Sequence, residues 1–126
     1  LMGTWCPNCK DEIVYYQELL EKHDDITVIG LCFEYPETFD GKRERVQRLK
    51  EKYNIEYPLL IAGNANKAET SAIMTQLNHV VSYPTTIIVD KAGKVRRVHT
   101  GFYGPGTGHY YEEYKEEMEA FLESLR

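Results

Sequence analysis

The sequence predicts an α/β fold in which helices cover a mixed β-sheet. Amphipathic helical patterns alternate along the chain with short runs of apolar or β-branched residues, as they do in layered α/β folds. The turn sequence Asp90-Lys91-Ala92-Gly93 joins two of these runs and predicts an antiparallel hairpin. The chain has 126 residues, of which 42% are hydrophobic and 28% charged, which suffices for one domain with a single core.

The first helix is expected to begin at Pro7, because proline favours the first helical position and an apolar face at helical spacing follows it. Cys6 then lies at the N-terminal tip of this helix. Residues 26–33 are apolar on both faces, as in a strand buried inside a parallel sheet. Residues 41–53 predict a second helix with one buried stripe, formed by Val46, Leu49 and Tyr53.

The second half of the chain predicts two more helices, an edge strand and the hairpin. Residues 57–61 form a short apolar run opened by a Tyr-Pro pair, which favours a brief edge strand. Residues 67–77 predict a modest helix, and the β-branched residues 85–89 are expected to pair with residues 94–100. After the glycine-rich residues 101–108, a long amphipathic helix is indicated by Tyr111, Tyr114, Met118, Phe121, Leu122 and Leu125.

Charge and hydropathy exclude two broad classes of function. The formal net charge is -5, and the sequence contains no basic cluster that would offset it, so a nucleic-acid partner is not expected. The longest apolar run covers residues 26–33, whereas a membrane-spanning helix needs about 20 apolar residues. The sequence therefore predicts no membrane span within these residues.

The most informative motif is Trp5-Cys6-Pro7-Asn8-Cys9. Two cysteines three positions apart in the first turn of a helix can close a disulfide, and the first is the more exposed of the two. The helix N-terminus carries roughly half a positive charge and stabilises a thiolate at Cys6. Cys6 can then attack a partner disulfide and Cys9 can resolve the mixed disulfide, so the motif predicts cycling between dithiol and disulfide.

Other interpretations of the cysteines stay open. A structural zinc site needs four ligands, usually with a second Cys or His pair at short spacing, but the four histidines are scattered along the chain. A purely structural disulfide is the second alternative. No metal or other cofactor is expected at the motif. Cys32 lies inside an apolar run and is expected to be a small buried hydrophobic residue.

Ser82-Tyr83-Pro84-Thr85 is the second informative motif. Pro84 opens a predicted strand, where it cannot donate a hydrogen bond to the sheet. If the Tyr83–Pro84 bond is cis, backbone groups of Tyr83 face the cysteine pair and offer an edge with which a substrate peptide can pair. A trans proline at the start of a strand is the alternative.

The order and spacing of these motifs resemble the thioredoxin superfamily, and in particular its TlpA-like branch. Trp-Cys-x-x-Cys at a helix start is followed about 75 residues later by the Tyr-Pro pair and its β-branched strand. The branch inserts a short strand and helix before its cis-proline, which matches residues 57–77. The resemblance covers essentially the whole chain and implies a thioredoxin-like fold.

The resemblance also implies roles for individual residues. Cys6 corresponds to the nucleophile, Cys9 to the resolving thiol and Pro84 to the cis-proline. Glu34 occupies a position similar to an acidic residue near the cysteine pair in some members. We expect a partly buried Glu34 to have a raised pKa and to exchange protons with Cys9, with an ordinary solvated glutamate as the alternative.

We therefore expect a thiol-disulfide oxidoreductase, an isomerase-like enzyme that exchanges disulfides with protein partners and is served by an upstream thiol reductant. Trp5 and Tyr83 are expected to contact the substrate. The resemblance implies a periplasmic or other extracytoplasmic location. A thioredoxin-fold interaction module with weak or no redox activity is the alternative, and a peroxide-reducing enzyme on the same fold is a third interpretation.

The beginning of the chain is abrupt for a fold of this kind. The cysteine helix should follow a buried strand, yet only Leu1 and Met2 precede Gly3-Thr4-Trp5-Cys6. We expect Leu1 to be an internal residue of a longer protein, so that residues 1–126 form a single thioredoxin-like domain that lacks its N-terminal strands, a central one included. A signal peptide or membrane anchor would lie upstream of Leu1.

Overall fold

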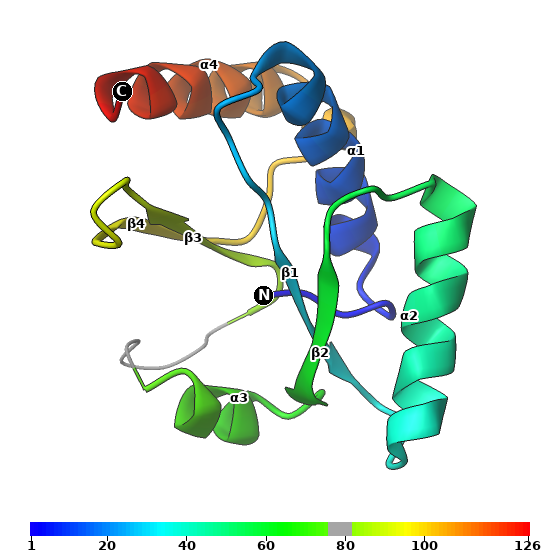
Figure 1. The fold of residues 1–126 in the computed structure, drawn as a ribbon. Helices are drawn as coiled ribbons and strands as arrows, with labels where there is room; N and C mark the ends of the chain where they lie inside the picture. Colours follow the sequence, from blue (N-terminus) through cyan, green and yellow to red (C-terminus); the bar gives the residue numbers. More distant parts are fainter. Residues whose placement is uncertain (76–81) are drawn as a thin grey trace.

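The computed structural model describes residues 1–75 and 82–126, and its elements follow the order expected from the sequence. The first half contains α1 (Pro7–Lys22), β1 (Gly30–Glu34), α2 (Phe39–Tyr53), β2 (Leu59–Asn64) and α3 (Lys67–Ile73). The second half contains β3 (Thr85–Val89), β4 (Val95–Thr100), the short 3₁₀ helix η1 (Pro105–Thr107) and α4 (His109–Ser124). Figure 1 shows β1 and β2 side by side at the centre, with α2 to one side and the β3–β4 hairpin to the other.

Several boundaries differ from the sequence-based expectation. The strand predicted at residues 26–33 begins only at Gly30, where the Gly30 N–H donates to the Pro58 carbonyl at 2.9 Å. Ile29, just before it, is 54% exposed, and the pairing with β2 begins at Gly30 and Leu59. β2 likewise lies further along than residues 57–61, because it follows the register of its partner β1. The end of the helix predicted at residues 67–77 lies outside the described residues.

α2 is longer at its start than expected, and its two caps explain where it begins and ends. The Thr38 hydroxyl accepts a hydrogen bond from the Gly41 N–H at 3.0 Å, which caps the first turn of the helix. Asn54 ends the helix with φ 52°, a left-handed conformation that asparagine tolerates better than most residues. Val46 and Leu49 are buried, as the helical pattern predicts.

In place of one predicted mixed sheet, the described residues form two pairs of strands, which the first two residues of the chain join. β1 and β2 are parallel, and β3 and β4 are antiparallel. The Met2 N–H donates to the Leu31 carbonyl and the Phe33 N–H donates to the Met2 carbonyl, both at 2.8 Å. Leu1 exchanges two hydrogen bonds with Thr85, at 2.7 and 3.0 Å. The backbone of residues 1 and 2 therefore connects the parallel pair to the antiparallel pair.

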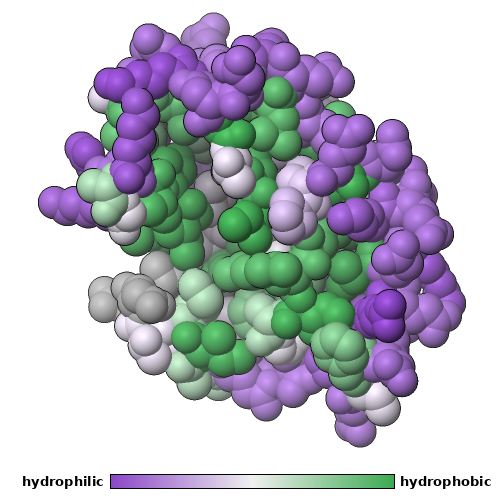
Figure 2. Space-filling view, viewed as in Figure 1, coloured by the Kyte–Doolittle hydropathy of each residue, from purple (hydrophilic) through white to green (hydrophobic). Residues whose placement is uncertain are grey.

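α1 lies between two apolar clusters, which fix the position of its N-terminal tip. The first cluster contains both cysteines of the motif and is formed by Met2, Cys6, Cys9, Ile13, Cys32, Val46, Leu49, Ile55 and Tyr57. The second joins α1 to the hairpin and α4, and is formed by Tyr15, Leu19, Ile88, Phe102, Tyr114 and Met118. In Figure 2 apolar side chains gather over the middle of the face, whereas hydrophilic side chains cover α2 and α4.

Within the described residues, no helix has both the length and the apolar composition that crossing a membrane requires.

Candidate active site

Cys6 and Cys9 form a disulfide at the N-terminal tip of α1. Cys6 is the N-cap residue of this helix, and its Sγ accepts a hydrogen bond from the Cys9 N–H at 3.2 Å. Pro7 occupies the first helical position, where its missing N–H costs no hydrogen bond. The N–H of Cys9 thus points at the Cys6 sulfur at the positive end of the helix, and this arrangement favours a thiolate once the disulfide is reduced.

Both cysteines are nearly buried. Cys6 is 4% exposed and Cys9 is 1% exposed, so the expected order of exposure holds by a small margin. Trp5 and Tyr83 are partly buried and pack against the cluster that contains both cysteines. Both rings therefore lie on the same apolar cluster as the disulfide.

Trp5 is held in place on several sides. Its indole N–H donates to the Phe33 carbonyl at 2.9 Å. The centroid of its ring lies 5.1 Å from that of Tyr35 and 5.3 Å, edge to face, from that of Tyr83. Gly3 has no room for a side chain, because a Cβ there would overlap the Trp5 indole and lie 2.9 Å from the Phe33 carbonyl oxygen. The ring next to Cys6 is consequently a fixed wall of the site.

The backbone around Tyr83 is fixed on both sides. The Tyr83–Pro84 peptide bond is cis. The Pro84 carbonyl accepts from the Gly101 N–H at 2.7 Å, and the Ser82 carbonyl accepts from the Thr85 hydroxyl at 2.7 Å. The N–H and C=O of Tyr83 itself make no backbone hydrogen bond to another described residue. Among the described residues, a short stretch of backbone without such a partner thus lies directly before β3.

Glu34 ends β1 as a fully buried carboxyl group. It accepts the Thr4 N–H at 2.9 Å and a second hydrogen bond from the Thr4 hydroxyl. Burial raises the pKa of Glu34, although the hydrogen bonds from Thr4 oppose the shift. No hydrogen bond between Glu34 and either cysteine is found among the described residues. Glu34 therefore holds the segment that leads into Cys6 rather than the sulfur atoms themselves.

A pocket of about 340 Å³ opens beside Glu34. It lies at the carboxyl ends of the parallel strands β1 and β2, the position at which open α/β sheets commonly bind ligands. Its lining consists of Glu34, Tyr35, Glu37, Asn64, Ala65, Asn66 and Glu69. Because Tyr35 also contacts Trp5, the pocket adjoins the wall of the cysteine site.

Glu12 is a buried carboxylic acid that the sequence reasoning did not select. It lies three residues after Cys9, on the same side of α1, and is 6% exposed. The Thr86 hydroxyl donates to Glu12 Oε2 at 3.3 Å, which leaves the Thr86 oxygen to accept from the Tyr16 hydroxyl at 2.7 Å. Burial raises the pKa of Glu12 to about 7. The signal in the sequence was a carboxylate inside the apolar stripe of α1.

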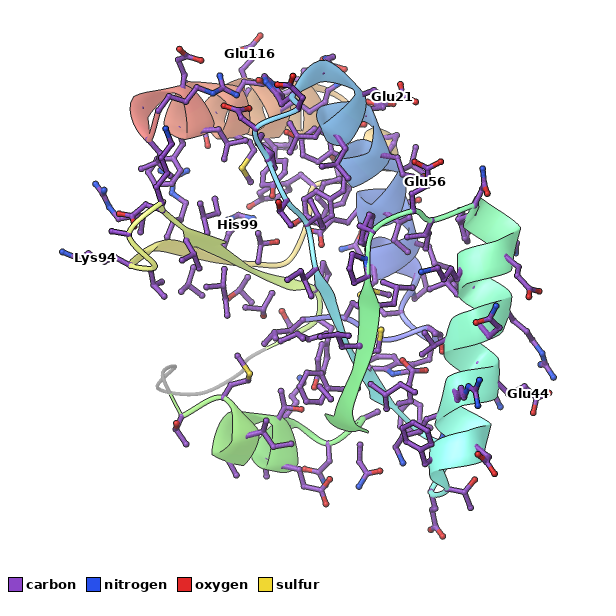
Figure 3. The ribbon with its side chains drawn as sticks, viewed as in Figure 1. Glu21, Glu44, Glu56, Lys94, His99 and Glu116 are labelled. Atoms are coloured by element: carbon purple, nitrogen blue, oxygen red, sulfur yellow. A yellow bond between two sulfur atoms is a disulfide. The ribbon has the colours of Figure 1, made fainter. Side chains whose placement is uncertain are left out.

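The described residues hold no metal-binding cluster. Among residues 1–75 and 82–126, no group of three or more His, Cys, Asp or Glu side chains could hold a metal ion. Figure 3 shows His99 turned from β4 toward α4, where its ring centroid lies 5.0 Å from that of Tyr114, whereas Lys94 and Glu44 point outward. Cys32 is a free and fully buried thiol, as its apolar surroundings predict.

Comparisons of the sequence find relatives along most of the chain. The sequence profile described as the AhpC/TSA family matches residues 1–98. The thioredoxin-like protein YneN of Bacillus subtilis is 27% identical over 100 residues, which cover 79% of this chain and 52% of that protein. The thiol-disulfide oxidoreductase ResA of Bacillus thuringiensis is 26% identical over 123 residues, covering 98% of this chain and 59% of ResA. The chain thus spans little more than half the length of the curated relatives that it matches.

A solved structure shares the fold. A protein from Chlorobium tepidum described as a thiol:disulfide interchange protein DsbE matches with a TM-score of 0.67 at 16% sequence identity, covering 94% of this chain and 74% of that chain. This likeness confirms the thioredoxin-like fold expected from the sequence.

Proposed function

The chain belongs to the AhpC/TSA family, and on this premise we propose that it is a thiol-disulfide oxidoreductase that exchanges disulfides with protein partners through its Cys-Pro-Asn-Cys motif. The observation that carries the proposal is the Cys6–Cys9 disulfide at the tip of α1, with Cys6 as the N-cap. The relatives named thiol-disulfide oxidoreductase support it, although their identity to this chain is modest.

The proposed reaction proceeds in two exchange steps. The Cys6 thiolate attacks one sulfur of a partner disulfide, which forms a Cys6–partner disulfide and releases the other partner sulfur as a thiolate. The Cys9 thiolate then attacks the Cys6 sulfur and releases the second partner thiolate, which takes up a proton. The partner gains two electrons, and the enzyme is left with the Cys6–Cys9 disulfide that the structure contains. A thiol reductant upstream restores the dithiol.

Cys9 must lose its proton before the second step, and we assign Glu12 as the group that accepts it. Glu12 follows Cys9 by one helical turn, and its pKa of about 7 allows it to take up and return a proton near neutral pH. The Thr86 hydroxyl fixes the orientation of the carboxyl group. Glu34 is a second proposed proton-exchange group, which Thr4 places at the entrance to the motif.

The partner chain is proposed to lie against the edge formed by Tyr83 and Pro84. The N–H and C=O of Tyr83, which have no backbone partner among residues 1–75 and 82–126, can form strand-like hydrogen bonds to an extended peptide. Trp5 and Tyr83 provide the apolar surface beside the reacting sulfur. As the resemblance to the TlpA-like branch implies, we expect the protein to work in an extracytoplasmic compartment.

Insulin reduction in the presence of dithiothreitol tests the proposal. The wild type should accelerate the reaction, and Cys6→Ser and Cys9→Ser should each abolish the acceleration. Cys32→Ala is the matched control, because it removes the buried thiol outside the motif and should leave the rate close to that of the wild type. A wild type that neither reduces insulin nor equilibrates with glutathione would favour the interaction module, and rapid peroxide consumption would favour a peroxide-reducing enzyme.

A further inference from the structure

The helix α3 contacts the candidate active site through a single fully buried side chain. Thr70 is 0% exposed, although it lies on a short helix with several exposed residues. Its hydroxyl forms a close hydrogen bond with the hydroxyl of Tyr83, which precedes Pro84. This hydrogen bond connects α3 to Tyr83, which forms the edge against which the partner chain is proposed to lie.

The direction of this hydrogen bond follows from the other partner of Thr70. The Thr70 hydroxyl donates to the Asn66 carbonyl at 3.0 Å, one turn earlier in the chain. A threonine hydroxyl has one hydrogen, so its oxygen must accept from Tyr83, and the Tyr83 hydroxyl is the donor. The bond therefore depends on a threonine or serine at position 70 and on the hydroxyl of Tyr83.

Tyr83 in turn contacts Trp5, the residue that precedes the proposed nucleophile Cys6. The Tyr83 ring meets Trp5 edge to face at 5.3 Å and Phe33 at 6.0 Å. The indole N–H of Trp5 donates a hydrogen bond to the Phe33 carbonyl, and Trp5 directly precedes Cys6 in the chain. Thr70, Tyr83 and Trp5 thus form a continuous line of contacts from α3 to the reacting cysteine.

We infer that Thr70 is a positioning residue, which holds the Tyr83 ring in the orientation that receives the partner polypeptide beside Cys6. The inference rests on the proposed function. Binding that immobilises a mobile side chain costs conformational entropy, which typically weakens binding by roughly two- to tenfold per side chain. A side chain that is already ordered before the partner binds avoids this loss. Thr70 itself touches neither the partner nor the sulfur atoms, and acts only through Tyr83.

Two kinds of measurement test the inference. Thr70→Val keeps the shape of the side chain and removes its hydroxyl, so the KM for insulin should rise about fivefold while kcat changes less than twofold. Thr70→Ser should restore the KM of the wild type. Trp5 is the only tryptophan, so its fluorescence reports on the contact with Tyr83, and its emission should change in Thr70→Val and return in Thr70→Ser.

Tyr83→Phe removes the same hydrogen bond from the other side and provides the test if Thr70→Val fails to fold. It should raise the KM by a similar factor, and the double variant should raise it no further. Thr75→Val is the control, because Thr75 is exposed just beyond α3 and should alter none of these quantities. A wild-type KM and emission in Tyr83→Phe, or additive effects in the double variant, would overturn the inference. A wild type without insulin reduction would instead refute the proposed function, and this inference with it.

Discussion

Replacing Glu12 by Gln should make the stability of the protein less dependent on pH. Glu12 is 6% exposed, and burial raises its pKa from an ordinary value of 4.5 to about 7. Glutamine has nearly the same size and can still accept the hydrogen bond from Thr86, but it never carries a charge. The variant therefore removes the cost of a buried carboxylate and little else.

The size and sign of the effect follow from the two pKa values. A carboxyl group whose pKa is raised on folding stabilises the folded state in its protonated form, fully below the unfolded pKa. This contribution is lost as the pH rises through the folded pKa of about 7. The difference between the two values corresponds to about 3 kcal/mol of unfolding free energy. Relative to Glu12→Gln, the wild type should therefore lose about 3 kcal/mol between pH 4.5 and pH 8.

Urea denaturation of the oxidised protein at several pH values measures this difference, with circular dichroism as the signal. Glu34, whose pKa is also raised, is present in both proteins, so its contribution cancels. Glu18→Gln is the control, because Glu18 lies on the exposed side of α1. Its unfolding free energy should change with pH in the same way as that of the wild type. A difference between Glu12→Gln and the wild type that stays constant from pH 4.5 to pH 8 would refute the reasoning.

Substitutions at three further positions have defined outcomes. Glu34→Gln should flatten the pH dependence of the disulfide exchange rate, because it removes a buried carboxyl with a raised pKa, and an unchanged profile would exclude a role in proton exchange. Thr38→Ala should lower the unfolding free energy by about 1 kcal/mol in urea denaturation, since it removes the cap of α2. Asn54→Gly should leave the thermal midpoint unchanged or raise it, whereas Asn54→Val should lower it, because only glycine adopts a left-handed conformation without cost.

The elements with a strong local signal could be predicted from the sequence. Pro7 after Cys6 marks the start of α1, and the β-branched residues 85–89 with the turn after them define the hairpin. These signals act between residues that are close in the chain. The division of the sheet could not be predicted in this way, because it depends on which distant backbone pairs with Leu1 and Met2.

The candidate site shows the same limit. The cysteine motif and Tyr83-Pro84 are readable as sequence, whereas the environment of a carboxyl group depends on the elements that pack around it. Glu12 stands inside the apolar stripe of α1, but its burial and its hydrogen bond depend on Thr86, 74 positions away in the chain. The bond between Thr70 and Tyr83 is likewise a tertiary contact with no local pattern.

The most direct test of the central claim is to trap the mixed disulfide. Reduced Cys9→Ala protein is mixed with a synthetic peptide that contains a disulfide, and the adduct is mapped by mass spectrometry. The account predicts a stable adduct at Cys6 in Cys9→Ala, no adduct in Cys6→Ala, and release of the reduced peptide by the wild type. No adduct in Cys9→Ala, or an adduct at Cys32 instead of Cys6, would contradict it.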